Sequence, residues 1–135
     1  MLDEVEGREL RVVERLAWHP SDGLEPNLHS GSVHLWFDGG RCAHFDAASD
    51  WTLSWSVTGP GDNDWLRQYD YEAEGRWLLR DASSEEPFAA VLGRRLVSTE
   101  PLFNDVDEVT GTLLRFDETE LTLSVSEGEL SAAPR

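Results

Sequence analysis

Apolar and polar residues alternate with a period of two through most of the chain, which is typical of strands whose two faces meet different surroundings. The run VHLWFDGGRCAHFDA, residues 33–47, predicts a β-hairpin. A turn at 39–41 would place six apolar side chains on its core face: Val33, Leu35, Phe37, Ala43, Phe45 and Ala47. The run LLRFDETELTLSV, residues 113–125, predicts a second hairpin, and WTLSWSV, residues 51–57, predicts a strand with Trp51 and Trp55 on its core side.

Two segments of the chain have similar sequences. GRELRVVERL at 7–16 and GRRLVSTEPL at 93–102 are separated by a constant offset of 86 residues. All but the first of the following pairs are identical: Leu2 and Phe88, Val5 and Val91, Gly7 and Gly93, Arg8 and Arg94, Leu10 and Leu96, Glu14 and Glu100, Leu16 and Leu102. Both copies continue into a run that ends in Phe-Asp, at Phe37 and at Phe116. We therefore expect residues 1–53 and 87–130 to form one β-β-β unit used twice, through an ancestral duplication.

A duplicated sequence separates two kinds of feature. Residues shared by both copies are expected to build the fold, and residues present in one copy are the better functional candidates.

A loop and a hairpin at 58–86 join the copies, and SSEEPFAAVLG, residues 83–93, predicts a short helix. The prediction is an all-β chain, a small barrel or sandwich of two pseudo-symmetric β-β-β repeats with one or two short helices, in a single domain over residues 1–135.

Charge narrows the choice of partner. The 135 residues carry 27 acids and 11 bases, a net charge of −16, while 39% of the residues are hydrophobic, enough for a core. Such a field repels phosphate backbones and anionic lipids, so we expect no direct nucleic-acid binding and no membrane binding. The single cysteine excludes an internal disulfide, and the chain start resembles no secretion signal, which favours a cytoplasmic location. The oligomeric state is not indicated.

Candidate chemistry is sparse. No hydrolase, nucleotide-binding or paired-cysteine motif occurs, so we expect a protein that is not an enzyme and uses no cofactor. The same turn at 39–41 would place His34 opposite Asp46, with His44 nearby on the outer face, and these groups could bind a transition metal. Histidine on a solvent-facing strand is more often only tolerated there, so we expect no metal site. Cys42 lacks an orienting partner and is expected to be a small, half-buried side chain rather than a nucleophile.

The chain is divided into an aromatic part and an acidic part. All six Trp precede the second copy, whereas residues 96–134 hold nine acids and one Arg. An acidic face beside exposed aromatic side chains would attract a basic partner quickly and then anchor it. The candidate contact residues are Trp18, on a loop expected at 17–30, Trp65, and five acids: Asp105, Asp107, Glu108, Glu118 and Glu120.

One resemblance supports the binding interpretation. GRWLLRDASSEEPF followed by GRRL, G-x-L-x-x-F-D and L-x-L resembles small uncharacterised acidic β-rich proteins of GC-rich bacteria. The size, charge and β-rich pattern are similar to those of immunity proteins of bacterial toxin systems. This resemblance implies a non-enzymatic acidic binding protein that neutralises a basic toxin or enzyme, and it assigns no site residues. Two alternatives stay open, a small-ligand or metal-binding β-barrel module and a structural or scaffold protein.

Overall fold

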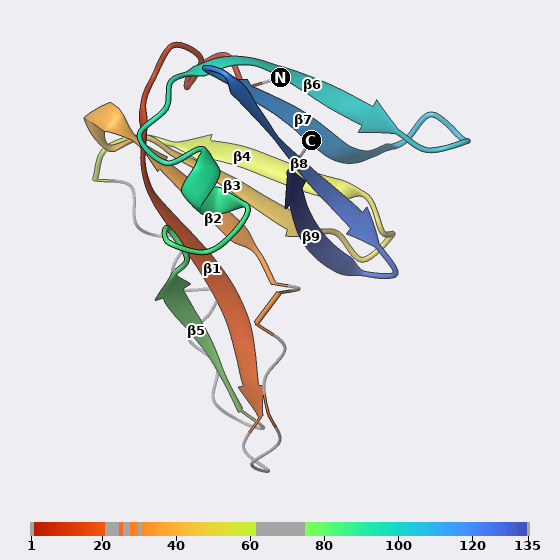
Figure 1. Ribbon diagram of the computed structural model, residues 1–135. Helices are drawn as coiled ribbons and strands as arrows, with labels where there is room; N and C mark the ends of the chain where they lie inside the picture. The colour runs from red at the N-terminus through yellow and green to blue at the C-terminus, as the bar shows by residue number, and fades with distance from the viewer. Residues whose placement is uncertain (1, 21–24, 26–27, 30, 62–74, 135) are drawn as a thin grey trace.

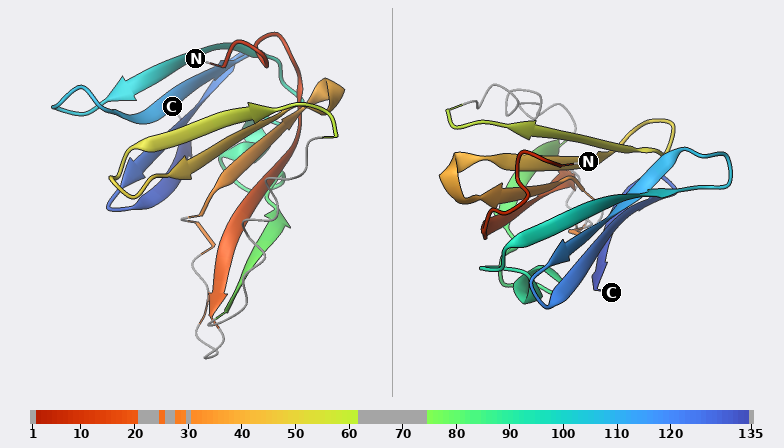
Figure 2. Two further views of the ribbon diagram at one scale, coloured as in Figure 1. Left: turned by 180° about the vertical axis from the view of Figure 1, so that it is seen from behind. Right: turned by 90° about the horizontal axis from the view of Figure 1, so that it is seen from above.

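The computed structural model describes residues 2–20, 25, 28–29, 31–61 and 75–134. Nine strands in these residues form two antiparallel sheets, which stack as two layers in Figures 1 and 2. The first sheet has the order β4-β3-β2-β1-β5 and the second β6-β7-β8-β9. The strands are β1 (Leu10–Pro20), β2 (Val33–Phe37), β3 (Cys42–Ala47), β4 (Leu53–Thr58), β5 (Gly75–Asp81), β6 (Leu96–Phe103), β7 (Val109–Phe116), β8 (Thr119–Ser126) and β9 (Glu129–Pro134). The all-β prediction is confirmed, in the form of two packed open sheets rather than a closed barrel.

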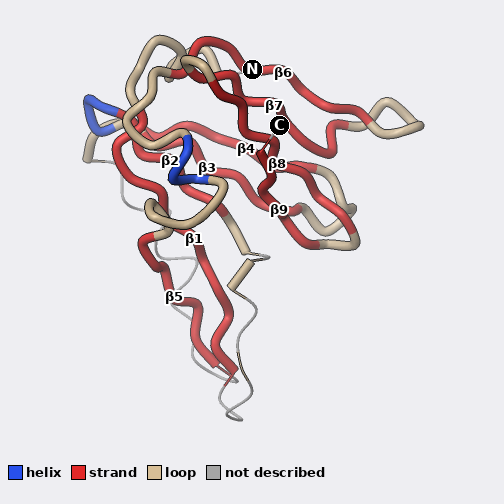
Figure 3. The backbone as a smooth tube through the Cα atoms, in the orientation of Figure 1, coloured by secondary structure: helices blue, strands red, loops and turns tan. Residues whose placement is uncertain are grey.

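Helical structure is limited to short turns. Within the described residues, Figure 3 shows 3-10 turns at Asp38–Gly40 and Phe88–Ala90. The helix expected at 83–93 is therefore wrong in extent. Phe88 and Val91 are both buried in the core. The Gly93 amide donates to the Leu10 carbonyl of β1, so the backbone leaves the helical conformation before a longer helix can form.

The core lies between the sheets and takes apolar side chains from both. The five residues Val33, Leu35, Phe37, Ala43 and Phe45 are buried together as predicted, and Ala47 packs against them. The turn between β2 and β3 is Asp38–Gly40, whereas the sequence predicted a turn at 39–41. As a result, Trp36 lies opposite Cys42. Both glycines of this turn have positive φ, a conformation that glycine adopts without steric cost. The shift moves the pairing by two residues, so every side chain keeps its face.

The two halves meet in a reciprocal pair of backbone contacts. The Gly7 amide donates to the Leu96 carbonyl at 2.7 Å, and the Gly93 amide donates to the Leu10 carbonyl at 2.8 Å. Both glycines have positive φ, 85° and 79°, and both leucines are fully buried. The residues that match at an offset of 86 therefore make matching contacts, each half closing on the other.

The matching positions of the two arginines, Arg8 and Arg94, have the same basis. Arg8 donates from its guanidinium to the carbonyl oxygen of Asp38 at 3.1 Å, and Arg94 donates to that of Asp117 at 3.2 Å. Each acceptor follows the Phe that ends β2 or β7. The arginines thus attach the start of each half to the turn that follows β2 or β7, which agrees with the structural role expected for shared residues.

Strand pairing also matches between the halves. Leu10 lies opposite Phe37 and Leu96 opposite Phe116, and each pairing is followed by a register irregularity after one residue. From there β1-β2-β3-β4 and β6-β7-β8-β9 run in equivalent order. The expected equivalence of Phe37 and Phe116 is observed in the pairing, while duplication as its origin stays a prediction.

β5 has no equivalent among the described strands of the second sheet. It pairs with the outer edge of β1 from Glu14 to Pro20. The hairpin expected around Gly75 lies partly in residues 62–74, outside the described residues. Within the described part, Gly75 begins β5, and the extra strand extends β1 through residues that were expected to be loop.

Arg15 fixes this enlarged sheet to the other layer. Its guanidinium, 3% exposed, donates to the carbonyl oxygens of His29 and Gly31 and to that of Leu130 in β9. Burial, with a smaller contribution from the charge of Arg80, lowers the Arg15 pKa to about 10. Arg15 therefore stays charged at neutral pH and joins the segment before β2 to β9 of the other sheet through backbone acceptors.

Candidate functional site

The β6–β7 hairpin projects from one end of the molecule, as Figure 1 shows. We define its tip as residues 103–108, FNDVDE. Two of these side chains are apolar and far from buried: Phe103 is 59% exposed and Val106 is 70% exposed. Apolar side chains held this far out on a short turn are available for contact with a partner.

A network around Asn104 holds the tip in one conformation. The Asn104 side-chain oxygen accepts from the backbone amides of Val106 at 3.0 Å and Glu108 at 2.9 Å. Its side-chain nitrogen donates to a Glu108 carboxylate oxygen at 3.2 Å. Such self-bonding by asparagine is a common way to fix a turn, and it reduces the conformational entropy that the tip would lose on binding.

Three acids surround the two apolar side chains. Asp105, Asp107 and Glu108 are all exposed, and no ion pair to any of them occurs within the described residues. Among the described residues, no cation offsets the charge of these carboxylates. The tip combines a small apolar apex with three exposed acids.

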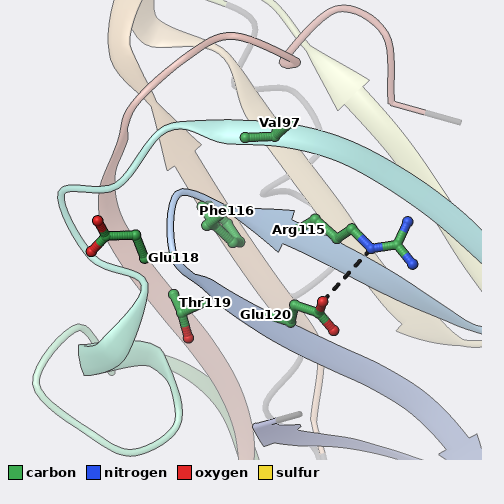
Figure 4. Close-up of a pocket in the computed structure, with 6 residues that line it drawn as sticks. All are labelled: Val97, Arg115, Phe116, Glu118, Thr119 and Glu120. Carbon is green, nitrogen blue, oxygen red and sulfur yellow. Dashed lines mark ion pairs between the residues drawn. The ribbon is translucent and has the colours of Figure 1, made fainter.

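The other two acids predicted as contact residues lie elsewhere. Glu118 and Glu120 follow β7 at the end opposite the tip, and they line a shallow groove of about 460 Å³ with Val97, Arg115, Phe116 and Thr119 (Figure 4). Arg94 pairs with Glu118 at 3.4 Å, and Arg115 pairs with Glu120 at 3.7 Å. Arg115 also pairs with Glu100 at 3.1 Å. The five acids therefore form two separate sets, and both acids of the groove set are paired with an arginine.

The aromatic residues proposed as anchors are placed differently from expectation. Trp18 lies within β1 opposite Trp77 of β5, not on a loop, because pairing with β5 extends the strand; its side chain is outside the described residues. Trp65 also lies outside the described residues. The exposed aromatic side chain beside the acids is Phe103, which was not among the contact residues predicted from the sequence.

Two tryptophans expected in the core are more exposed than predicted. Trp51 is 58% exposed on the β3–β4 turn, and Trp55 is 38% exposed on β4. The reason is position: Trp51 precedes the strand and has positive φ, and β4 is the outermost strand of its sheet. Alternation indicated the face correctly, since Leu53 on the same face is buried, but it does not indicate which strand is at the edge.

The weak candidates for a metal site, His34, His44 and Asp46, are not arranged as the sequence suggested. His34 lies opposite His44, not opposite Asp46, whose partner is Ser54. His34 is 1% exposed, and the two imidazole rings meet edge to face with centroids 5.0 Å apart. Burial, and secondarily the charge of His44, lowers the His34 pKa to about 4. No group of three or more metal-binding side chains occurs in the described part of the chain.

Cys42 is also less accessible than expected. Its side chain is fully buried, and burial raises the pKa of its thiol, with a smaller contribution from the charge of Glu14. A buried, protonated thiol is a poor nucleophile. The structure therefore places no reactive cysteine on the surface.

Comparison of the chain with protein-family models, with curated proteins and with solved structures found no match. In the described residues, no helix has the length and apolar character needed to cross a membrane.

Proposed function

We propose that this protein is a non-enzymatic, cytoplasmic binding protein that captures a basic protein partner, in the manner of an immunity protein that neutralises a toxin. The observation that carries the proposal is the tip, where Phe103 and Val106 project among Asp105, Asp107 and Glu108. Buried aromatic anchors with a charged surround are the usual composition of a strong protein contact.

The whole-molecule charge supports the same partner. A net charge of −16 attracts a basic protein over a distance comparable with the Debye length, about 8 Å at physiological salt. The uncompensated tip acids then select the orientation of the encounter, and the apolar apex slows dissociation.

Affinity capture with matched baits tests this function. The tip variant carries Asp105→Asn, Asp107→Asn and Glu108→Gln, and the groove variant carries Glu118→Gln and Glu120→Gln. We expect the unmodified bait to retain a basic protein that the tip variant loses and the groove variant keeps. Equal recovery on all three baits, or recovery of acidic proteins only, would refute the proposal.

A further inference from the structure

β4 and β9 are the equivalent outermost strands of the two halves. Ala47 of β3 lies opposite Leu53, and Val125 of β8 lies opposite Leu130. From this pairing, Trp55 corresponds to Ala132 and Val57 to Pro134. Each strand is the last in its sheet, so each has one edge with no partner strand among the described residues.

Only one of these edges is protected. β9 begins with Glu129 and ends with Pro134. β4 has the sequence LSWSVT, with no charge and no proline. Natural proteins commonly place charges or prolines on sheet edges, because an unprotected edge can pair with another strand.

The hydrogen-bonding direction of β4 follows from its register. The Ala48 amide donates to the Thr52 carbonyl, and hydrogen-bonded pairs alternate along an antiparallel ladder. Leu53, Trp55 and Val57 therefore direct their amides and carbonyls toward the outer edge. The equivalent outward position on β9 is Pro134, which has no amide to offer.

We propose that the outer edge of β4 binds an extended basic segment of the partner protein as an added antiparallel strand. This inference rests on the proposed function for the basic character of the partner. The segment would receive main-chain hydrogen bonds from Leu53, Trp55 and Val57, as in other strand-addition complexes.

The surroundings of β4 select basic side chains. Asp46, exposed, lies opposite Ser54 on the neighbouring strand, and Asp50 is fully exposed on the turn before β4. The exposed indoles of Trp51 and Trp55 offer faces for a guanidinium or ammonium group. A second copy of this chain is disfavoured as the occupant, because each copy would bring a net charge of −16.

The test uses the full-length protein and a short synthetic peptide that alternates Arg and Val. The control peptide has the same charge but Pro in place of Val. Affinity is measured by titration calorimetry, and amide hydrogen exchange is followed at Leu53, Trp55 and Val57. We expect the Arg-Val peptide to protect these three amides and the proline peptide to leave them unprotected.

Val57→Pro copies the protection found on β9 and should weaken the Arg-Val peptide about tenfold through the lost amide and its steric effect. Ser56→Lys, on an exposed position, should weaken it by charge repulsion even if the proline variant does not fold. Ala132→Pro on β9 is the matched control and should leave the affinity unchanged.

Equal binding of both peptides without amide protection would overturn the proposal, because attraction by charge alone would explain it. A dimer of the unmodified protein in sedimentation velocity that Val57→Pro dissociates would also overturn it, by assigning the edge to a second copy. The tip variant should retain peptide protection on β4. Failure of this edge and failure of the captured complex can therefore be observed separately.

Discussion

The two halves of the molecule have the same strand order and pairing from β1 to β4 and from β6 to β9, but they differ in their side-chain contacts. Glu14 in the first half accepts a hydrogen bond from the Trp36 indole at 2.5 Å, whereas its equivalent Glu100 pairs with Arg115. His34 of the first hairpin corresponds to Leu113 of the second. The shared residues close the halves on each other, while the unshared ones produce the contact between buried His34 and half-buried His44 in one half and an acidic tip in the other. Two halves with the same strand pairing can therefore carry different side chains on their surfaces.

The largest expected effect tests whether the halves are equivalent in the core. Leu10→Ala and Leu96→Ala each remove a fully buried side chain at the junction. Each should lower the free energy of unfolding by about 2–5 kcal/mol, and the two losses should agree within about 1 kcal/mol. Urea denaturation followed by circular dichroism measures both. A clear loss for one variant alone would mean that the junction is not symmetric in energy.

The next effect separates the halves by pH. His34 has a pKa of about 4 in the folded protein, against an ordinary value of 6.5. Between these two pH values His34 is protonated in the unfolded chain and neutral in the folded one. Its neutral form is favoured in the fold, so stability should fall as the pH drops from about 6.5 to about 4, by roughly 3 kcal/mol in total. His34→Leu, which copies Leu113, should remove this part of the pH dependence. An unchanged pH profile in His34→Leu would assign the acid sensitivity to other groups.

A smaller effect tests the reciprocal turns. Gly7→Ala and Gly93→Ala place a side chain at positive φ with no atom nearby to clash, so the cost is conformational. Each should lower the free energy of unfolding by about 1–2 kcal/mol. Gly59→Ala, also in open space but without positive φ, is the control and should be close to neutral. Thermal unfolding of the three variants provides the comparison, and a loss in Gly59→Ala as large as the others would remove the explanation.

Much of the fold could be predicted because it depends on local pattern. Alternation placed Val33, Leu35 and Phe37 on the core face, and the offset of 86 identified residues that make matching contacts. The turn position was missed, since Asp38–Gly40 and 39–41 leave the same faces inward. The position of β5 could not be predicted, because alternation reports which face of a strand is buried and not which strand lies beside it.

The candidate site was predicted only in part. Asp105, Asp107 and Glu108 do lie together at an exposed tip, but Glu118 and Glu120 do not join them, since the eight residues of extended β7 separate the two groups. A signal for Phe103 was present in the sequence: an aromatic residue directly before Asn-Asp, two residues that favour turns. The exposure of a side chain such as Phe103 depends on how far its hairpin extends beyond the sheet. The alternation of apolar and polar residues does not report this distance.

The most direct test of the central claim is the association rate of the captured basic partner, measured by surface plasmon resonance. The tip variant should associate about tenfold more slowly with little change in dissociation, and the groove variant should associate at nearly the unmodified rate. Raising salt from about 50 to about 500 mM, which shortens the Debye length from about 14 to about 4 Å, should slow the unmodified protein to the rate of the tip variant. Phe103→Ala should instead speed dissociation. An association rate that changes neither with salt nor on substitution of the tip acids would contradict the account. The acidic tip would then make no contribution to association with the partner.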